Sequence, residues 1–181
     1  MPKRVLIISS TPRVGGNSEI LCKEFKRGAE ESGNFVYMIS LRDMNLHNCI
    51  GCGLCNANDH TSCFQKDDME DILQKMIDAD IIVLATPVYF YAMSSQMKMF
   101  IDRCCAGYTK IADKRFYLIA TAQDPREETL EATFLGFNGF LESLENAIEI
   151  GRLYGVGLWN KGDVYNNPRL LEQAYSIGKH I

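Results

Sequence analysis

The sequence predicts an α/β fold in which helices cover both faces of a parallel sheet. Short apolar runs rich in β-branched residues alternate five times with amphipathic stretches of helical period. One of these runs, residues 81–90, is almost continuously apolar, as expected for a central strand that is buried on both faces. Because no repeat or linker interrupts the pattern, we expect residues 1–181 to form a single domain.

The first part of the chain contains two predicted strands and one predicted helix. Residues 4–9 form an apolar run bounded by proline and glycine, and residues 35–40 form a second run of this kind, so both are predicted strands. Between them, residues 18–33 place apolar side chains on one helical face, and Gly33 is a suitable helix stop.

The middle of the chain contains the central strand between two helices. Residues 67–80 form an amphipathic helix with acidic residues at its start, where the helix dipole favours them. The strand at 81–90 follows, and a helix is predicted over residues 94–105 with Ser94 as its N-cap.

The last part of the chain contains two more strand and helix pairs. We predict strands at residues 115–122 and 151–159, a long helix at 127–150, and a closing helix at 167–181 that begins near a proline. With turn residues after its first strand, this pattern suits a flavodoxin-like, doubly wound, five-stranded parallel sheet of order 2-1-3-4-5.

The composition excludes several classes of protein. The formal charge of −4 argues against a dedicated nucleic-acid binder. The sequence contains no run of about 18 apolar residues, the length that a membrane span needs. The apolar run at residues 5–8 is too short for a signal peptide. We therefore expect a cytoplasmic protein with reduced thiols and no membrane partner, and the odd number of cysteines, seven, fits a disulfide framework poorly.

The loop after the first strand has the residues of an anion site. It leads into a helix N-terminus, which favours phosphate, and it contains hydroxyl, amide and cationic side chains together with two glycines. Those side chains are Ser10, Thr11, Arg13, Asn17 and Ser18. The loop has neither the GxGxxG nor the Walker A pattern. The alternative is an ordinary strand–helix turn that Asn17 or Ser18 caps.

The loop after the central strand is rich in aromatic residues. Pro87, Tyr89, Phe90 and Tyr91 follow a strand end, where doubly wound folds bind ligands. Exposed aromatic rings at such a place indicate packing against a flat ligand or beneath a neighbouring subunit.

Four cysteines are concentrated in an irregular segment at about residues 43–66. Cys49, Cys52 and Cys55 have the spacing C-x₂-C-x₂-C, and Cys63 follows. This spacing suits a 4Fe–4S cluster better than a structural zinc site, which more often uses two separated C-x₂-C pairs. The alternatives are free thiols or one disulfide. We expect His47 and His60 to be exposed to solvent, and the remaining cysteines to have packing or surface roles.

These stretches together resemble the NAD(P)H-dependent FMN reductase family, in particular its iron–sulfur flavoprotein branch. The resemblance rests on "STPRVGGNS", the "CIGCGLC" segment and "TPVYFYAMSSQMKMFIDR". It implies that the first loop holds the FMN phosphate. It also implies that the isoalloxazine ring is bordered by Pro87, Val88, Tyr89, Phe90, Thr121 and Ala122. Val14 stands where a lysine is common in the family.

Three functions are compatible with these features. The first is an FMN-dependent oxidoreductase that moves electrons from NAD(P)H to a small-molecule or quinone-type acceptor. The second is an iron–sulfur flavoprotein electron carrier that a ferredoxin reduces, and the third is a non-redox binding module. The resemblance further implies a homodimer or homotetramer, and we expect Met97, Phe100 and Ile101 to lie near the flavin loop at the subunit contact.

Overall fold

A computed structural model of the chain describes residues 1–57 and 62–181 and contains the predicted parallel sheet. Five parallel strands lie in the order β2-β1-β3-β5-β6. Their bounds are Arg4–Ser9 (β1), Phe35–Ser40 (β2), Ile81–Tyr89 (β3), Arg115–Thr121 (β5) and Ile148–Gly155 (β6). The two-residue strand β4, Ala92–Met93, pairs antiparallel with β3 and was not predicted. With β4 set apart, the order is the predicted 2-1-3-4-5, and the predicted fold class is confirmed.

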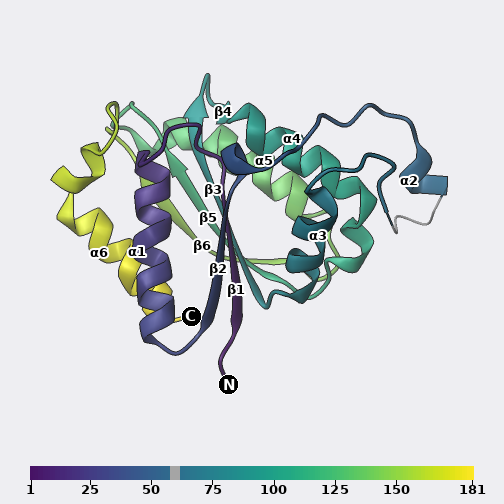
Figure 1. Cartoon of the computed structure of the whole chain (residues 1–181). Coiled ribbons are helices and arrows are strands. Elements are labelled where there is room, and N and C mark those ends of the chain that lie inside the picture. Colours follow the sequence, from purple (N-terminus) through teal and green to yellow (C-terminus); the bar gives the residue numbers. More distant parts are fainter. Residues whose placement is uncertain (58–61) are drawn as a thin grey trace.

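Helices cover both faces of this sheet (Figure 1). Helices α1 and α6 lie on one face, and α3, α4 and α5 lie on the other. The bounds are Asn17–Glu31 (α1), Met69–Asp78 (α3), Ser95–Arg103 (α4), Glu131–Leu141 (α5) and Pro168–Lys179 (α6). Each face carries its own buried apolar cluster, and residues Ile81–Ala85 of β3 contribute alternately to the two. The central strand is therefore buried on both faces, as predicted.

The parallel register brings several loops to one edge of the sheet. Ser9, the last residue of β1, pairs with Ala85 of β3, while Pro87 pairs with Thr121 at the end of β5. Thr121 in turn pairs with Gly155 at the end of β6. The loops that follow these four strands therefore start side by side, where doubly wound sheets bind ligands.

Short helical turns connect the longer elements. The helix α2, Leu54–Ala57, lies within the predicted cysteine-rich segment, so the expectation of a wholly irregular stretch was wrong. The 3₁₀ helices are η1 (Leu41–Asp43), η2 (Cys104–Ala106), η3 (Tyr108–Lys110), η4 (Glu127–Leu130) and η5 (Asp163–Asn166). Within the described residues, no helix is both long and apolar enough to span a membrane.

The predicted long helix at 127–150 was wrong in its second half. Helix α5 ends at Leu141, and β6 begins at Ile148, which pairs with Arg115 of β5. Between them Asn146 has φ of 52°, and its side-chain amide donates to Asp113 Oδ1 at 3.0 Å. A left-handed residue cannot continue a helix, so the chain turns at Asn146, and from Ile148 onward it pairs with the sheet.

The aromatic loop also differs from the prediction. Phe90 and Tyr91 have φ of 49° and 62°, and they form the two-residue turn between β3 and β4. Two successive positive φ values are typical of a type I′ hairpin turn, which usually contains asparagine and glycine. Because Phe90 and Tyr91 are not the usual residues of such a turn, the sequence did not indicate a hairpin here.

Helices α1 and α6 cross at two glycines. A Cβ atom added to Gly28 of α1 would lie 2.1 Å from the Tyr175 carbonyl oxygen, and one added to Gly178 of α6 would lie 2.0 Å from the Phe25 carbonyl oxygen. Both carbonyl oxygens are backbone atoms, so they cannot move away by a change of side-chain rotamer. The two helices therefore approach so closely only because both positions lack a side chain.

We expect Gly28→Ala to lower the free energy of unfolding by about 1–3 kcal/mol, because the new methyl group forces α1 and α6 apart. Gly139→Ala in α5 is the matched control, since a Cβ there would meet nothing within 4 Å. The control should be neutral or stabilising by up to about 1 kcal/mol. Urea unfolding measures both, and equal midpoints for the two variants would contradict the prediction.

Candidate functional site

A cavity of about 370 Å³ lies at the sheet edge where the four loops start. It is lined by residues after β1, at the end of β3, after β5 and after β6. They are Thr11, Arg13, Gly16, Asn17, Pro87, Val88, Tyr89, Phe90, Thr121, Ala122, Gln123, Leu158 and Trp159. The structure thus brings together all predicted cofactor-binding residues except Ser10 and Ser18.

Ser10 and Ser18 are both fully buried and lie away from the cavity wall. The Ser10 hydroxyl donates to the Ala85 carbonyl at 3.1 Å and accepts from Ser94 Oγ at 2.8 Å. Ser18 Oγ has no hydrogen-bond partner among the described residues. Ser10 therefore ties β1 to β3 and to the start of α4.

Asn17 has a structural role within the cavity wall. Its side-chain nitrogen donates to the Asn160 carbonyl at 2.8 Å, and its side-chain oxygen accepts from the Val164 backbone at 3.2 Å. The residue thereby holds the segment after β6 against the start of α1. The N-cap of α1 is Gly16, so the alternative that Asn17 or Ser18 caps this helix was wrong.

The first loop is shaped by two glycines. Gly15 has φ of 69°, and a Cβ at Gly16 would lie 2.6 Å from Thr11 Oγ1. The Gly15 backbone nitrogen donates to Glu19 Oε2 at 3.0 Å. A side chain at position 16 would fill the concave surface that Thr11 and the first turn of α1 form.

The buried carboxylate of Glu19 accepts a hydrogen bond from the backbone of this loop at Gly15. It pairs with Arg42 of η1 at 2.7 Å and with Lys23 at 2.6 Å. Burial raises the pKa of Glu19, but the hydrogen bonds from Lys23, Gly15 and Arg42 outweigh it, so the pKa lies below its ordinary value. Glu19 therefore links the first loop to the segment that leads toward the cysteines.

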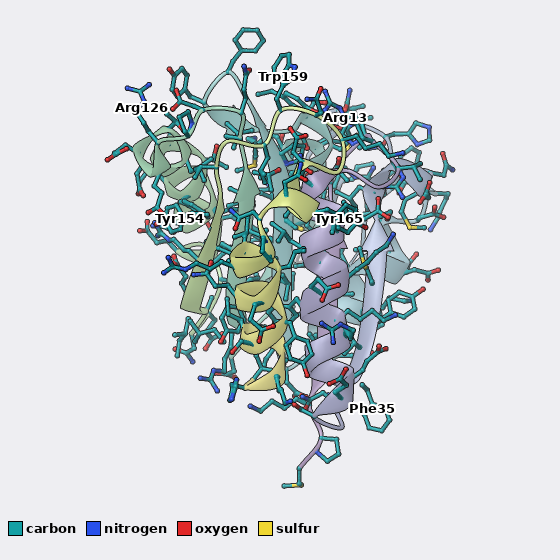
Figure 2. All side chains as sticks on the ribbon, turned by 90° about the vertical axis from the view of Figure 1, so that its left-hand side faces the viewer. Arg13, Phe35, Arg126, Tyr154, Trp159 and Tyr165 are labelled. Carbon is teal, nitrogen blue, oxygen red and sulfur yellow. The ribbon has the colours of Figure 1, made fainter. Side chains whose placement is uncertain are left out.

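Arg13 and Trp159 both line the cavity and lie at the same end of the molecule (Figure 2). Arg13 Nη1 donates to the Trp159 carbonyl at 3.1 Å, and both residues lie at the end of the molecule opposite Phe35. The sequence reasoning missed Gln123, Leu158 and Trp159. The single tryptophan, placed just after a predicted strand end, was the available signal.

The aromatic hairpin stands beside the same cavity. The Phe90 side chain is completely exposed, and its neighbour Tyr91 is anchored because Thr133 Oγ1 donates to the Tyr91 carbonyl at 3.3 Å. Positive φ values at bulky aromatic residues are strained and cluster at functional sites. The hairpin holds an exposed ring next to the cavity in a fixed backbone conformation.

Comparison with known proteins identifies the family. Residues 3–142 match the NADPH-dependent FMN reductases. The chain belongs to this family. The match covers both the first loop and the aromatic hairpin, so the cavity wall of this FMN reductase family member is formed largely by the matched residues.

Curated relatives include iron–sulfur flavoproteins. One from Methanocaldococcus jannaschii is 42% identical over 100 residues, which are 55% of this chain and 51% of the relative. The one from Methanosarcina thermophila is 34% identical over 96 residues, 53% of this chain and 49% of the relative. The chain thus spans about half the length of the curated relatives it matches.

Solved structures share the fold at low sequence identity. An NAD(P)H:quinone oxidoreductase from Methanothermobacter marburgensis superposes with a TM-score of 0.74 at 18% identity, over 99% of this chain and 96% of that chain. An azoreductase from Bacillus anthracis has a TM-score of 0.75 at 15% identity, over 99% of this chain and 100% of that chain. At such identities the likeness shows the flavodoxin-like fold alone.

The four predicted cluster ligands are not gathered into a metal-holding group among the residues that the structure describes. Cys49 and Cys52 are exposed, Cys55 and Cys63 are half-buried, and all are free thiols. No group of three or more His, Cys, Asp or Glu side chains in the described residues is arranged to hold a metal ion. The thiols offer the donor chemistry of a cluster, but their described arrangement does not fit one. His47 is exposed as predicted, and His60 lies outside the described residues.

A buried ion pair anchors the cysteine-rich segment to α4. Arg103 donates to both carboxylate oxygens of Asp67, at 2.6 and 2.9 Å, and to the His47 carbonyl at 2.7 Å. It also donates to Cys63 Sγ at 3.4 Å. Its side chain is 1% exposed and that of Asp67 is not exposed at all. The sequence reasoning read Asp67 only as part of a helix start and missed the pair.

The Asp67 carboxyl makes the free energy of unfolding depend on pH in the acidic range. Burial raises the pKa of Asp67, but the hydrogen bonds from Arg103, His47 and Met69 outweigh it and lower the pKa from 3.8 to about 2. A depressed pKa contributes stability that is present above the unfolded value and is lost as the pH falls through the folded value.

We therefore expect Asp67 to contribute about 2 kcal/mol of stability at neutral pH and to lose it between about pH 4 and pH 2. The measurement is urea unfolding of wild type and Asp67→Asn across this range. The difference in unfolding free energy between the two proteins should shrink as the pH falls. A constant difference down to pH 2 would contradict the assignment.

Proposed function

We propose that this chain is an FMN-dependent oxidoreductase that moves electrons from NAD(P)H to a small-molecule or quinone-type acceptor. The observation that carries the proposal is the cavity at the strand ends, where a glycine-shaped loop at a helix N-terminus faces an aromatic hairpin. A helix N-terminus attracts phosphate, and aromatic side chains pack against flat rings. Family membership supports the same cofactor.

The residues that line the cavity suit FMN in two parts. Thr11 and Arg13 would hold the phosphate in the concave surface left by Gly16. The wall formed by Pro87, Val88, Tyr89, Phe90, Thr121 and Ala122 would border the isoalloxazine ring. When bound, FMN supplies hydride and single-electron transfer, while the protein supplies binding and orientation. Trp159 would border the bound cofactor beside Arg13, which donates to its carbonyl.

The second candidate function is an iron–sulfur flavoprotein electron carrier that a ferredoxin reduces. Two observations favour it, namely the names of the curated relatives and the four cysteines in one segment. In that case residues 43–66 form a cluster-binding insertion in a single FMN-binding domain of residues 1–181. A carrier would accept electrons from reduced ferredoxin and would not need a nicotinamide site.

One set of measurements on anaerobically purified protein separates the two functions. Mass spectrometry of the released flavin should identify FMN, and recovery of mainly FAD would contradict the cofactor assignment. NADPH or NADH should then bleach the flavin in a protein without iron if the reductase function holds. Iron and sulfide in the protein, with bleaching by reduced ferredoxin alone, would establish the carrier.

We also propose that the protein works as a homodimer or homotetramer in the cytoplasm. The exposed Phe90 beside the cavity supports this, because a second subunit would cover the ring. Met97 and Phe100, which the sequence placed at the subunit contact, are instead completely buried in the protein's own core.

We expect light scattering at micromolar concentration to give at least twice the 20.4 kDa mass of one chain. The Phe90→Ser variant should weaken the association, because the new side chain removes the apolar area that the contact would bury. Leu135→Ser is the matched control, since Leu135 is also an exposed apolar side chain but does not line the cavity. A monomer that binds FMN normally would contradict the proposal.

A further inference from the structure

Cys105 lies against the cysteine-rich segment, although it is 50 residues from Cys55 in the sequence. The Sγ atoms of Cys55 and Cys105 are 3.7 Å apart, and Asn56 Oδ1 lies 3.8 and 3.9 Å from the two sulfurs. A disulfide requires the sulfurs to approach to about 2.05 Å, which is a small movement from this distance. We propose that Cys55 and Cys105 are a thiol modification site and form a reversible disulfide.

Both thiols are held in place by anchored backbone. Cys105 belongs to η2, directly after α4, and its neighbour Cys104 is buried in the core. On the other side, Cys55 belongs to α2 and packs partly against the same apolar cluster. Arg103 fixes the two ends of the segment by its bonds to the His47 carbonyl and to Asp67. The fold therefore holds the two sulfurs close together, so disulfide formation does not require a large movement of the chain.

The surroundings select this pair among the seven cysteines. Cys105 is exposed and, with Asn56, lines a cavity of about 880 Å³ between α4 and α5, so a small oxidant can reach it. Cys22 and Cys104 are buried, and burial raises the pKa of both thiols far above the ordinary value. Such thiols are inert. Cys63 Sγ is engaged differently, because it accepts a hydrogen bond from Arg103.

Hydrogen peroxide is an oxidant that balances the reaction. One thiolate attacks a peroxide oxygen, the O–O bond breaks, and the leaving hydroxide takes a proton to become water. The second thiol then displaces the hydroxyl of the resulting sulfenic acid, which leaves as a second water, and the S–S bond forms. Each sulfur loses one electron, the peroxide gains two, and both thiol protons end in water.

The disulfide would withdraw one of the four predicted cluster ligands. With Cys55 bonded to Cys105, the segment retains Cys49, Cys52 and Cys63, which are too few for a cluster held by four thiolates. The inference itself uses only two thiols and peroxide, so it does not rest on the proposed flavin chemistry.

The experiment uses full-length protein that has been reduced, treated with a chelator and assayed to contain no iron. One equivalent of hydrogen peroxide is added, free thiols are alkylated, and the protein is digested without reductant for peptide mass spectrometry. Thiols titrated after unfolding in denaturant should fall by two from the seven of the chain. The main cross-linked peptide should contain Cys55 and Cys105, and dithiothreitol should restore all thiols.

Two serine variants control the assignment, with circular dichroism to show that each is folded. Cys105→Ser should lose the cross-link, whereas Cys49→Ser, which removes an exposed thiol of the same segment, should retain it. The proposal is overturned if the main wild-type disulfide joins two of Cys49, Cys52 and Cys63, or if no disulfide forms. It is also overturned if Cys105→Ser still loses two thiols with the wild-type yield.

Discussion

Replacing Arg103 with methionine is expected to lower the free energy of unfolding by about 3–5 kcal/mol, the largest effect of any single substitution considered for this protein. The guanidinium is buried with the Asp67 carboxylate, and its removal leaves that charge without its partner in the protein interior. The His47 carbonyl and Cys63 Sγ also lose their donor. The measurement is the urea unfolding midpoint with the slope checked for constancy.

The matched control is Lys98→Met on the same helix. Lys98 forms an exposed ion pair with Asp102, and such pairs contribute at most about 1 kcal/mol. The double variant Arg103→Met/Asp67→Leu should recover part of the loss, because it removes the uncompensated charge. If Arg103→Met and Lys98→Met unfold at the same urea concentration, the buried pair does not stabilise the protein as described.

The double variant Thr11→Val/Arg13→Ala is expected to weaken FMN binding by about two to four orders of magnitude. Both residues line the cavity beside the first turn of α1. A hydrogen bond to a charged group contributes about 1.5–3 kcal/mol, and each 1.4 kcal/mol is about tenfold in affinity. Asn17 is left intact because its amide holds the segment after β6.

Riboflavin is the control ligand for this experiment, because it has the ring of FMN without the phosphate. Fluorescence quenching titrations of wild type and variant should show a large loss for FMN and nearly the same affinity for riboflavin. Ser10→Ala serves as the control variant, since the Ser10 hydroxyl bonds to Ala85 and Ser94 and does not line the cavity. Equal losses for both ligands in the double variant would place the phosphate elsewhere.

The sequence by itself determined the strand order and most of the cavity wall. Residues 4–9 and 35–40 are strands with the predicted bounds, because short runs rich in β-branched and apolar residues between turn residues favour strands. Ser94 caps α4 as predicted, since its side chain accepts from the Met97 backbone. Once the strands are parallel, their loops must meet at one edge, so Thr11, Pro87 and Thr121 could be assigned to one site from local patterns alone.

Only the tertiary structure decided the features that depend on pairs of residues distant in the chain. Asn146, in the connection between α5 and β6, bonds to Asp113, and Trp159, which lines the cavity, accepts a hydrogen bond from Arg13 at its carbonyl. The bonds of Arg103 to Asp67, and the contact of Cys105 with Cys55, join segments that are 36 and 50 residues apart. Periodicity records which face of an element is buried, but it carries no information about which distant side chain will meet that face.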